Sequence, residues 1–430
     1  MLCASVIGVV SAQAQHSGQT QRAFVPSVEA LGRGDGAAAL PGSSNPLFYN
    51  PAHLATRPPS LTAFRLHGSG SGHVADQFRL MARGQPGTAL NGDLEAYEAG
   101  FEALSDTVRS VGTRPSIFET TLALPSGIYR AGAYAFSAGA YVHGSINQRF
   151  EETPARIPRA NHTSRTDAMF LVAVGYDASA YVSGLSAGLT LKATRRYVSF
   201  LDTRIDALSP DDKMPVLDAT PMIGRLAIFD GRADQNPVWA GSSVGMDLGV
   251  LYTVQTLDLP GELHVGATVF DLFASRFGFT LHDDALSIPI VGAFLPDQPA
   301  YVTNGNVDVP DTLPADAADR FQPHASVRIG AAYTVDSFSV LDNIGVTLDY
   351  QEYRHPRVRQ PVATRFHLGA EAQYDILIAR LGLNQGYPTA GVGLRMGHIH
   401  VDYAFYGREE GTSFRETYNH VNTLQMALRF

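Results

Sequence analysis

The sequence has one cysteine, few charged residues and no long apolar run. Only 17% of its 430 residues are charged, and Cys3 lies in an N-terminal segment expected to be removed. The mature chain then has no thiol, which excludes disulfides, cysteine-based zinc sites and thiol catalysis. Beyond the first positions no stretch of about 18 to 20 residues is free of polar interruption, so a membrane-spanning helix is not expected.

Other features that are missing from the sequence narrow the range of possible functions. The net charge is -9, and no stripe concentrates lysine and arginine, which excludes a nucleic-acid partner. No nucleophile elbow, phosphate loop or zinc-protease motif occurs, so neither an enzyme nor a cofactor is predicted. A metal site at His367, His398, His400 and Asp402 is disfavoured, and no metal is expected. Acidic residues gather in 202–234 and 283–319, which we interpret as solvated loops rather than calcium sites.

The N-terminus has the form of an export signal. Residues 1–14 are an apolar run that ends in Ala12-Gln13-Ala14, the small-x-small form of a signal-peptidase site. A positive n-region is missing, so a buried strand is the alternative. We predict that 1–14 is a signal peptide and that the chain is exported.

Glycine, aromatic residues and period-2 alternation are abundant. The chain has 41 Gly, 18 Tyr and 22 Phe, and apolar and polar residues alternate over segments of about ten residues, enough to cross a bilayer as tilted strands. In the last segment the apolar residues are Leu424, Met426, Leu428 and Phe430. A soluble sandwich rarely needs strands so long, glycine-rich and numerous. We therefore predict an all-β transmembrane antiparallel β-barrel of about fourteen strands, within a range of fourteen to sixteen.

The connections predict the orientation. Short ones are expected at Pro125-Ser126-Gly127, Asp177-Ala178-Ser179 and Leu341-Asp342-Asn343, and long ones at 150–166, 200–238 and 273–323. Short periplasmic turns and long outer loops produce this asymmetry. A strand is also expected at 75–83. Three- and four-residue spacing of apolar residues predicts one amphipathic loop helix from Asn91 to Val111, which either packs on the rim or acts as a lid.

Two blocks carry a family resemblance. The first combines the Gly32-x-Gly34-x-Gly36 region with Phe48-Tyr49-Asn50-Pro51-Ala52, and the second is 382–389 followed by 402–406. They resemble the FadL-like outer-membrane β-barrel superfamily, especially the PorV/PorQ-like branch. The resemblance covers both ends of the chain and hardly any of 150–320.

The resemblance implies an arrangement in three parts: a signal peptide at 1–14, an N-terminal plug at 15–58 and a barrel at 59–430. In the plug, Asn50 would hydrogen-bond backbone groups and Pro51 would fix a turn. A static plug that only seals the pore is the alternative to a moving one. Phe430, a terminal aromatic, looks like the signal read by the outer-membrane insertion machinery.

Inward-facing polar residues are expected to form a mixed-charge lumen. They are Arg328, Asp349, Arg365, His367, Glu371, Arg380, Arg395, His400 and Asp402. We interpret them as an ion-pair network that stiffens the wall and satisfies the plug; a site for a ligand carboxylate is the alternative.

The function implied by the resemblance is passive uptake of hydrophobic small molecules, such as fatty acids or aromatics, across a Gram-negative outer membrane. The ligand would leave sideways through the barrel wall into lipid, where each buried CH₂ contributes about 0.8 kcal/mol. The alternative is a PorV-like shuttle or scaffold with secretion-system proteins as partners. A lipid hydrolase is a third and weak option, because a Ser-His-Asp or paired-Glu signature is missing.

Overall fold

The computed structural model describes most of the chain. The described residues are 24–42, 45–71, 116–152, 158–204, 238–254, 260–282, 311–313, 315–353, 361–409, 414–415 and 418–430. The predicted signal peptide, the strand at 75–83 and the loop helix from Asn91 to Val111 lie outside these residues and stay predictions.

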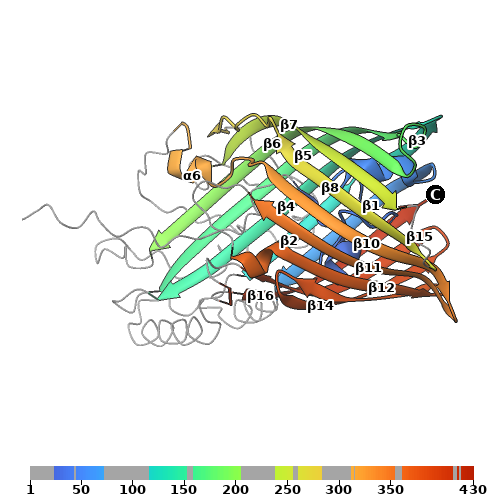
Figure 1. Cartoon of the computed structure of the whole chain (residues 1–430). Coiled ribbons are helices and arrows are strands. Elements are labelled where there is room, and N and C mark those ends of the chain that lie inside the picture. The colour runs from blue at the N-terminus through green and yellow to red at the C-terminus, as the bar shows by residue number, and fades with distance from the viewer. Residues whose placement is uncertain are drawn as a thin grey trace, which may run out of the picture.

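The described elements are mostly strands, and the helices are short (Figure 1). The strands are β1 (Ser60–Ser71), β2 (Ser116–Ala123), β3 (Ser126–Ala131), β4 (Tyr134–Glu152), β5 (Pro158–Asp177), β6 (Leu185–Arg204), β7 (Trp239–Val254), β8 (Glu262–Leu272), β9 (Thr280–Leu281), β10 (Ser326–Phe338), β11 (Leu341–Tyr353), β12 (Phe366–Tyr374), β13 (Leu377–Asn384), β14 (Tyr387–Met396), β15 (Ile399–Glu409) and β16 (Tyr418–Arg429). The helices are α1 (Val28–Gly32), η2 (Pro51–Thr56), α6 (Ala315–Asp319) and η4 (Val362–Arg365).

The strands form one closed antiparallel sheet. Neighbours along the path pair antiparallel, and β16 pairs with β1 from Ser71↔Val421 to Thr62↔Arg429, which closes the barrel. Strands β2 and β3 share one position between β1 and β4, and β9 pairs only with β7, off this path. Fourteen positions therefore surround the barrel in the described residues, which confirms the predicted fold class. No described helix is long and apolar enough to cross a membrane.

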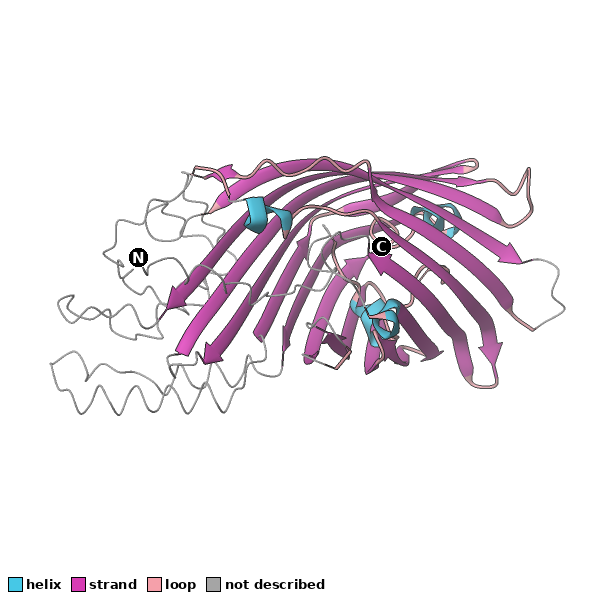
Figure 2. Ribbon diagram, turned by 60° about the vertical axis from the view of Figure 1, so that its left-hand side comes forward, coloured by secondary structure: helices cyan, strands magenta, loops and turns pink. Residues whose placement is uncertain are grey.

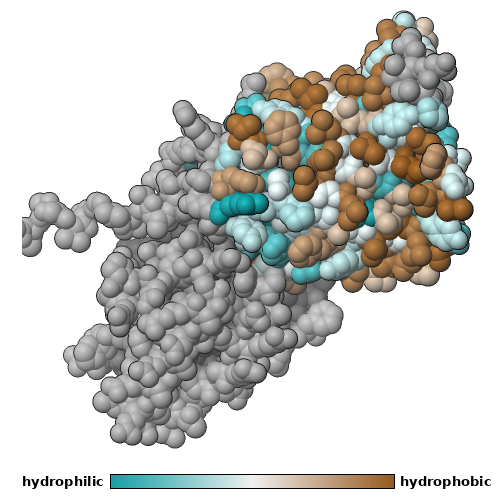
Figure 3. All heavy atoms as spheres, turned by 60° about the horizontal axis from the view of Figure 1, so that its bottom comes forward, coloured by the Kyte–Doolittle hydropathy of each residue, from teal (hydrophilic) through white to brown (hydrophobic). Residues whose placement is uncertain are grey.

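Alternation along each strand separates two faces. In β16 the side chains of Leu424 and Met426 are 49% and 45% exposed, whereas those of the alternating residues Thr423 and Gln425 are buried. Figure 3 shows apolar side chains spread over the outer surface of the strands. The outside of the wall therefore suits acyl chains, and the inside is mostly polar.

The N-terminal segment lies inside this ring. In Figures 1 and 2 the helical turns of the first described residues are enclosed by strands. Every residue of α1 is buried, and α1 packs on β13 to β16. The turn η2 packs on the opposite side, against β4 to β7. We call residues 24–57 the plug.

Two predicted short connections are wrong in position, and the long connection predicted at 150–166 is wrong in extent, because β4 continues to Glu152 and β5 begins at Pro158. Pro125-Ser126-Gly127 was expected as a turn, but the chain continues in the same direction from β2 into β3, and the turn comes at Gly132, which has a φ of 61°. Both halves find partners on β1 and β4, so strand pairing overrides the turn-forming composition. The turn expected at Leu341-Asp342-Asn343 lies between Phe338 and Leu341 instead.

The assignment of the outer, lipid-facing side of the wall can be tested with a charged substitution. Leu381 of β13 is 67% exposed near the middle of its strand. Replacing it with arginine should destabilise the barrel by about 2–4 kcal/mol, because a charge then lies in hydrocarbon. Urea titration of the chain folded into vesicles measures this, with Leu381→Ala as the control. Equal stability of the two variants would contradict the assigned outer face.

Candidate functional site

Asn50 joins three parts of the site. Its side-chain oxygen accepts from the N–H of Ala52 at 3.0 Å and caps η2, with Pro51 at the first position. Its amide nitrogen donates to the Ala38 carbonyl at 2.8 Å and to the Val250 carbonyl of β7 at 3.0 Å. One buried side chain therefore links η2, the preceding plug loop and the wall.

The glycine block ends α1 and brings the plug backbone against the wall. Gly34 has a φ of +74°, the left-handed conformation that commonly follows a helix. A Cβ on Gly34 would also overlap the backbone of Leu368 and Leu383 on β12 and β13. At Gly36 a Cβ would overlap the side chain of Thr347. Gly32 lies against Gly391 of β14. Glycine is needed at these positions because a Cβ would meet atoms of the wall, and at Gly34 also because of its positive φ.

The inner wall carries matching glycines. A Cβ on Gly249 of β7 would overlap Asn50 Oδ1, and one on Gly188 of β6 would overlap the Pro51 backbone. These two glycines are register partners. Further wall glycines with plug atoms in the position of a Cβ are Gly175, Gly266, Gly369, Gly382 and Gly391. The glycine content of the strands thus reflects close approach of two backbones.

A charged group stands at the centre of the plug. Asp35 accepts from the Tyr49 hydroxyl at 2.8 Å and from Arg328 of β10 at 2.6 Å. Burial raises the pKa of Asp35, but the charge and hydrogen bond of Arg328 outweigh it and hold the pKa below its ordinary value. Burial and the neighbouring Asp35 raise the pKa of Tyr49, which keeps its hydroxyl protonated as the donor. Asp349 of β11 receives the N–H groups of Ala37 and Ala38, both at 2.8 Å.

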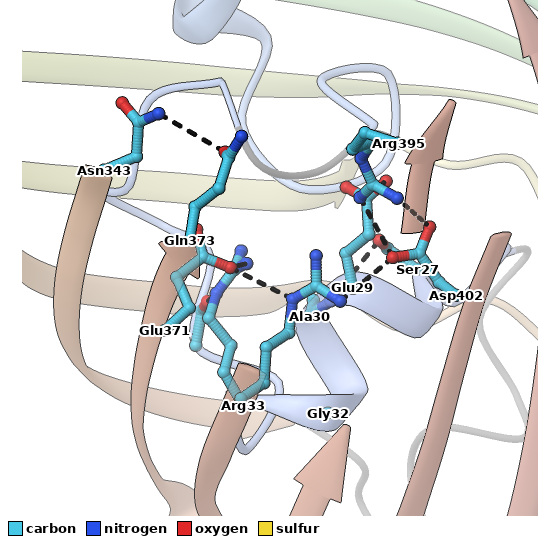
Figure 4. Close-up of polar contacts among 12 residues, drawn as sticks. Ser27, Glu29, Ala30, Gly32, Arg33, Asn343, Glu371, Gln373, Arg395 and Asp402 are labelled. Atoms are coloured by element: carbon cyan, nitrogen blue, oxygen red, sulfur yellow. Dashed lines mark hydrogen bonds and ion pairs between the residues drawn. The ribbon is translucent and has the colours of Figure 1, made fainter. Parts of the chain in front are cut away.

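A second charged group joins α1 to β12–β16, and we call it the arginine–carboxylate chain (Figure 4). Its consecutive N···O distances are Arg33–Glu371 2.8 Å, Glu371–Arg380 3.1 Å, Arg380–Asp402 2.9 Å, Asp402–Arg395 2.9 Å, Arg395–Glu29 3.3 Å and Glu29–Arg429 2.9 Å. Burial raises the pKa of Glu29, but the arginines around it bring the pKa well below 4.5. Removing Glu371 would take from the buried Arg33 its carboxylate in this chain, and breaking a buried pair in this way costs about 3–5 kcal/mol.

The opposite side of the plug is apolar. Leu47, Phe48 and Leu54 belong to a buried cluster that includes the wall side chains Ala123, Ala135, Tyr141, Met169, Leu171 and Ala173. The rings of Phe48 and Tyr141 meet edge to face at 4.9 Å. The Tyr141 hydroxyl accepts from Asn45 of the plug at 3.0 Å. The inner face of β4 and β5 is therefore apolar where it meets the plug.

The wall is irregular beside this apolar cluster. Four steps from Ala123 to Gly127 oppose three steps on β4, from Tyr141 to Ala138, so one residue is unmatched around Leu124 and Pro125. On the next strand, the β1 register against β16 shifts between Thr62 and Phe64. Each is a β-bulge, and Pro125 has no N–H to donate. We call this pair of adjacent bulges the wall break.

Most of the residues expected in the plug and lumen lie inside the barrel. Gly32, Gly34, Gly36, Phe48, Tyr49, Asn50, Pro51 and Ala52 are all buried in the plug, and Arg328, Asp349, His367, Arg380 and Asp402 are buried inside the wall. Glu371 and Arg395 belong to the arginine–carboxylate chain, and His400 lies on the inner face of β15. Phe430 ends the chain and bonds to Leu61 through its backbone.

The lumen prediction is wrong for Arg365. It lies in η4, where the strand alternation is interrupted, and its guanidinium contacts the Tyr350 hydroxyl at 3.1 Å and Glu352 at 3.4 Å. Tyr350 packs on Phe366, which is exposed on the outer face. Arg365 therefore belongs to the outer rim. Among the described residues no group of three or more His, Cys, Asp or Glu side chains could hold a metal ion.

Several site residues were not identified from the sequence. Glu29, Arg33 and Asp35 provide the plug charges, and Arg65 and Arg429 lie on the strands that close the barrel. A signal existed in β1, where Arg65, His67, Ser69 and Ser71 alternate and are buried. A polar residue at every second position of that strand marks the inner face.

The chain resembles solved β-barrels at low identity. No protein-family model matches it, and no curated protein matches it. The toluene transporter TbuX of Ralstonia pickettii has 15% identity and a TM-score of 0.46, covering 94% of this chain and 97% of that one. The CymD monoaromatic hydrocarbon channel has 13% identity and a TM-score of 0.45 over 94% and 97%. The translocator domain of autotransporter NalP from Neisseria meningitidis has 10% and 0.38 over 87% and 89%.

The fit of the plug in the wall can be tested at one glycine. Gly249→Ala should destabilise the plug by about 1–3 kcal/mol, because the methyl group takes the space of Asn50 Oδ1. Single-channel conductance in planar bilayers should rise as the plug leaves its seat. Gly68→Ala is the control, since a Cβ there meets nothing within 4 Å. Equal conductance of both variants would contradict the fit.

Acid should loosen the plug through His53. Burial, followed by the charge of Arg57, lowers the pKa of His53 from 6.5 to about 3. A released plug binds a proton there below pH 6.5 and a seated plug does not, so stability falls from pH 6.5 toward pH 3, by up to about 1.4 kcal/mol per pH unit. Below pH 4.5, protonation of Glu29 and Asp35 lowers the stability of the seated plug further, because their pKa values in it are lowered from 4.5 and 3.8.

Limited proteolysis of the plug between pH 6.5 and 4.5 measures this effect. The wild-type chain should be cleaved faster as the pH falls, whereas His53→Gln should show a weaker dependence, because glutamine does not titrate. Other buried histidines of the wall are common to both proteins. An identical pH dependence in the two would rule out His53 as the group responsible.

Proposed function

We propose that this chain is a FadL-like outer-membrane channel for passive uptake of hydrophobic small molecules, which leave sideways through the wall break. The observation that carries the proposal is the position of the break. The bulges of β1 and of β2–β3 lie on adjacent strands, and the wall next to them has an apolar inner face where it meets the plug.

The chemistry favours a sideways route. A hydrophobic molecule gains little in a polar, hydrated lumen, but each CH₂ that moves into acyl chains contributes about 0.8 kcal/mol. Tyr141 belongs to the apolar inner cluster and the partly buried Ile128 packs against it, whereas Leu61, Phe64 and Leu124 are exposed on the outer face near the break. Apolar contact is thus available on both sides of the wall. A break in the strand ladder is the place where the wall opens at least cost, because fewer backbone hydrogen bonds are lost.

The attachment of the plug favours movement on one side. Toward β12–β16 it is held by the arginine–carboxylate chain, which is costly to break. Toward β4 and β5 it is held mainly by contacts of Leu47, Phe48 and Leu54. An apolar ligand can replace such contacts with its own, because they have little directional preference. We infer that the loop around Phe48 yields while α1 stays in place.

The outer membrane of a Gram-negative cell is the location that suits a closed barrel with an apolar exterior. Outer-membrane lipid and a hydrophobic small molecule are the partners of the proposed function. Catalysis has no part in it. The signal peptide and the insertion signal at Phe430 provide the route to that membrane in this proposal.

The route can be narrowed at Gly139. A Cβ on Gly139 would come within 2.9 Å of the Tyr141 ring and 3.1 Å of Ser126 Cβ, at the inner side of the break. Gly139→Val should therefore reduce uptake of labelled decanol severalfold in cells that carry the chain in their outer membrane and have no other channel of this class. Gly144→Ala on the same strand is the control, because its Cβ has ordinary contacts only.

Wild-type uptake by the Gly139→Val variant, at equal amounts of folded protein, would exclude the route past the break. If cells with the wild-type chain take up no decanol at all, the channel function itself fails. Copurification with secretion-system proteins would then favour the PorV-like alternative.

A further inference from the structure

An arginine on the outer face of the wall marks the end of its apolar band. The outward-facing residues of β6 are leucine or alanine from Leu185 to Ala193, and the next one is Arg195. Its register partner on β7 is Ser242, the first polar outward residue beyond Val244, which is 61% exposed. A tilted strand crosses the hydrocarbon core in about 9–11 residues. Arg195 therefore lies just outside that core, at the level of the lipid headgroups.

This end of β6 is the outer one in the orientation that the connections indicate. After Arg204, β6 is joined to β7 by the long connection 205–238, whereas Leu185 follows the short connection from Asp177. Long connections lie on the outer surface of such barrels, and short ones on the periplasmic side. Arg195 is therefore placed beside the headgroups of the outer leaflet.

Arg195 has no acidic partner among the described residues. Its guanidinium donates to the Ser242 hydroxyl at 3.1 Å and lies 5.7 Å from the centre of the Tyr197 ring. Both contacts are with neutral groups, and the side chain is exposed. A guanidinium has more N–H donors than one hydroxyl can use. The contacts thus hold the planar group against the wall and leave donors for an acceptor outside the chain.

Other arginines at this end of the barrel have a carboxylate of their own. Arg365, on the outer rim, lies 3.4 Å from Glu352, and Arg276 lies 3.0 Å from Asp319. Their charges are balanced within the chain. Arg195 is at the same end and at the edge of the apolar band, but it is balanced by no described residue. An anion that is itself located at headgroup level is the complement it fits.

We propose that Arg195, together with Ser242 and Tyr197, forms a binding site for the phosphate group of an outer-leaflet lipid. The guanidinium can bind two phosphate oxygens through paired, charge-assisted hydrogen bonds, and the Ser242 hydroxyl can donate a further one. The Tyr197 ring suits the boundary between acyl chains and headgroups. The acyl chains of the same lipid would lie over Leu191 and Val244, both exposed on the apolar band. The site rests on the membrane location in the proposed function.

Native mass spectrometry of the full-length folded chain in nonionic detergent tests the site. Dioleoyl phosphatidic acid and dioleoylglycerol share their acyl chains, and only the first has a phosphate. The wild-type chain should bind the phosphatidic acid at least about tenfold more tightly. Arg195→Gln should lose most of this preference, and Arg195→Lys should keep part of it, because lysine retains the charge without the planar fork. The net charge of -9 opposes nonspecific binding of an anionic lipid.

The matched control is Arg365→Gln, which removes the same charge at the outer rim, where Glu352 is already the partner. It should keep the wild-type preference. An unchanged preference in Arg195→Gln, or an equal loss in both variants, would overturn the site at Arg195. Inorganic phosphate that binds the wild-type chain as tightly as phosphatidic acid does would overturn the assignment to a lipid.

Uptake of decanol separates this site from the channel function. A wild-type chain that takes up decanol but does not prefer phosphatidic acid keeps the channel function and overturns the lipid site. A wild-type chain that prefers phosphatidic acid through Arg195 but takes up no decanol supports the lipid site and overturns the channel function.

Discussion

The need to pair every backbone N–H and C=O in hydrocarbon governs this structure. An unpaired group costs several kcal/mol there, so the fourteen strand positions close through β1 and β16 and leave no edge. The same requirement makes the wall break conspicuous, because two adjacent strands are irregular at one level. Closure decides what is enclosed, and the break is a place where the pairing of the enclosing strands is irregular.

The enclosed space is divided by chemistry. Charged side chains of β10 to β16 hold α1 and the Asp35 loop, and apolar side chains of β4 and β5 face Phe48. Ion pairs fix position and orientation, because each needs a defined geometry. Apolar contacts fill space and can be exchanged. The plug is therefore held by ion pairs on the side of β10 to β16 and by apolar contacts on the side of β4 and β5.

The barrel could be predicted from the sequence because lipid and lumen impose period-2 alternation on each strand separately, as in β16. The irregular places could not. The segment around Pro125 has the composition of a turn, but pairing with β1 on one side and β4 on the other keeps the chain running in one direction from β2 into β3. In the sequence, Arg365 stands two residues before His367 and therefore at an inward-facing position of the alternation in β12. In the structure it belongs to η4 instead and lies on the outside. The pair Glu29–Arg429 joins positions 400 apart and depends on how α1 is rotated, which no local pattern records.

The Glu29–Arg429 pair also connects the plug with the strand that closes the ring. Arg429 lies on the strand that completes the ring, and it contacts a residue near the start of the described chain. The strand that seals the cylinder therefore also holds its contents, because β16 pairs with β1 and its Arg429 contacts Glu29.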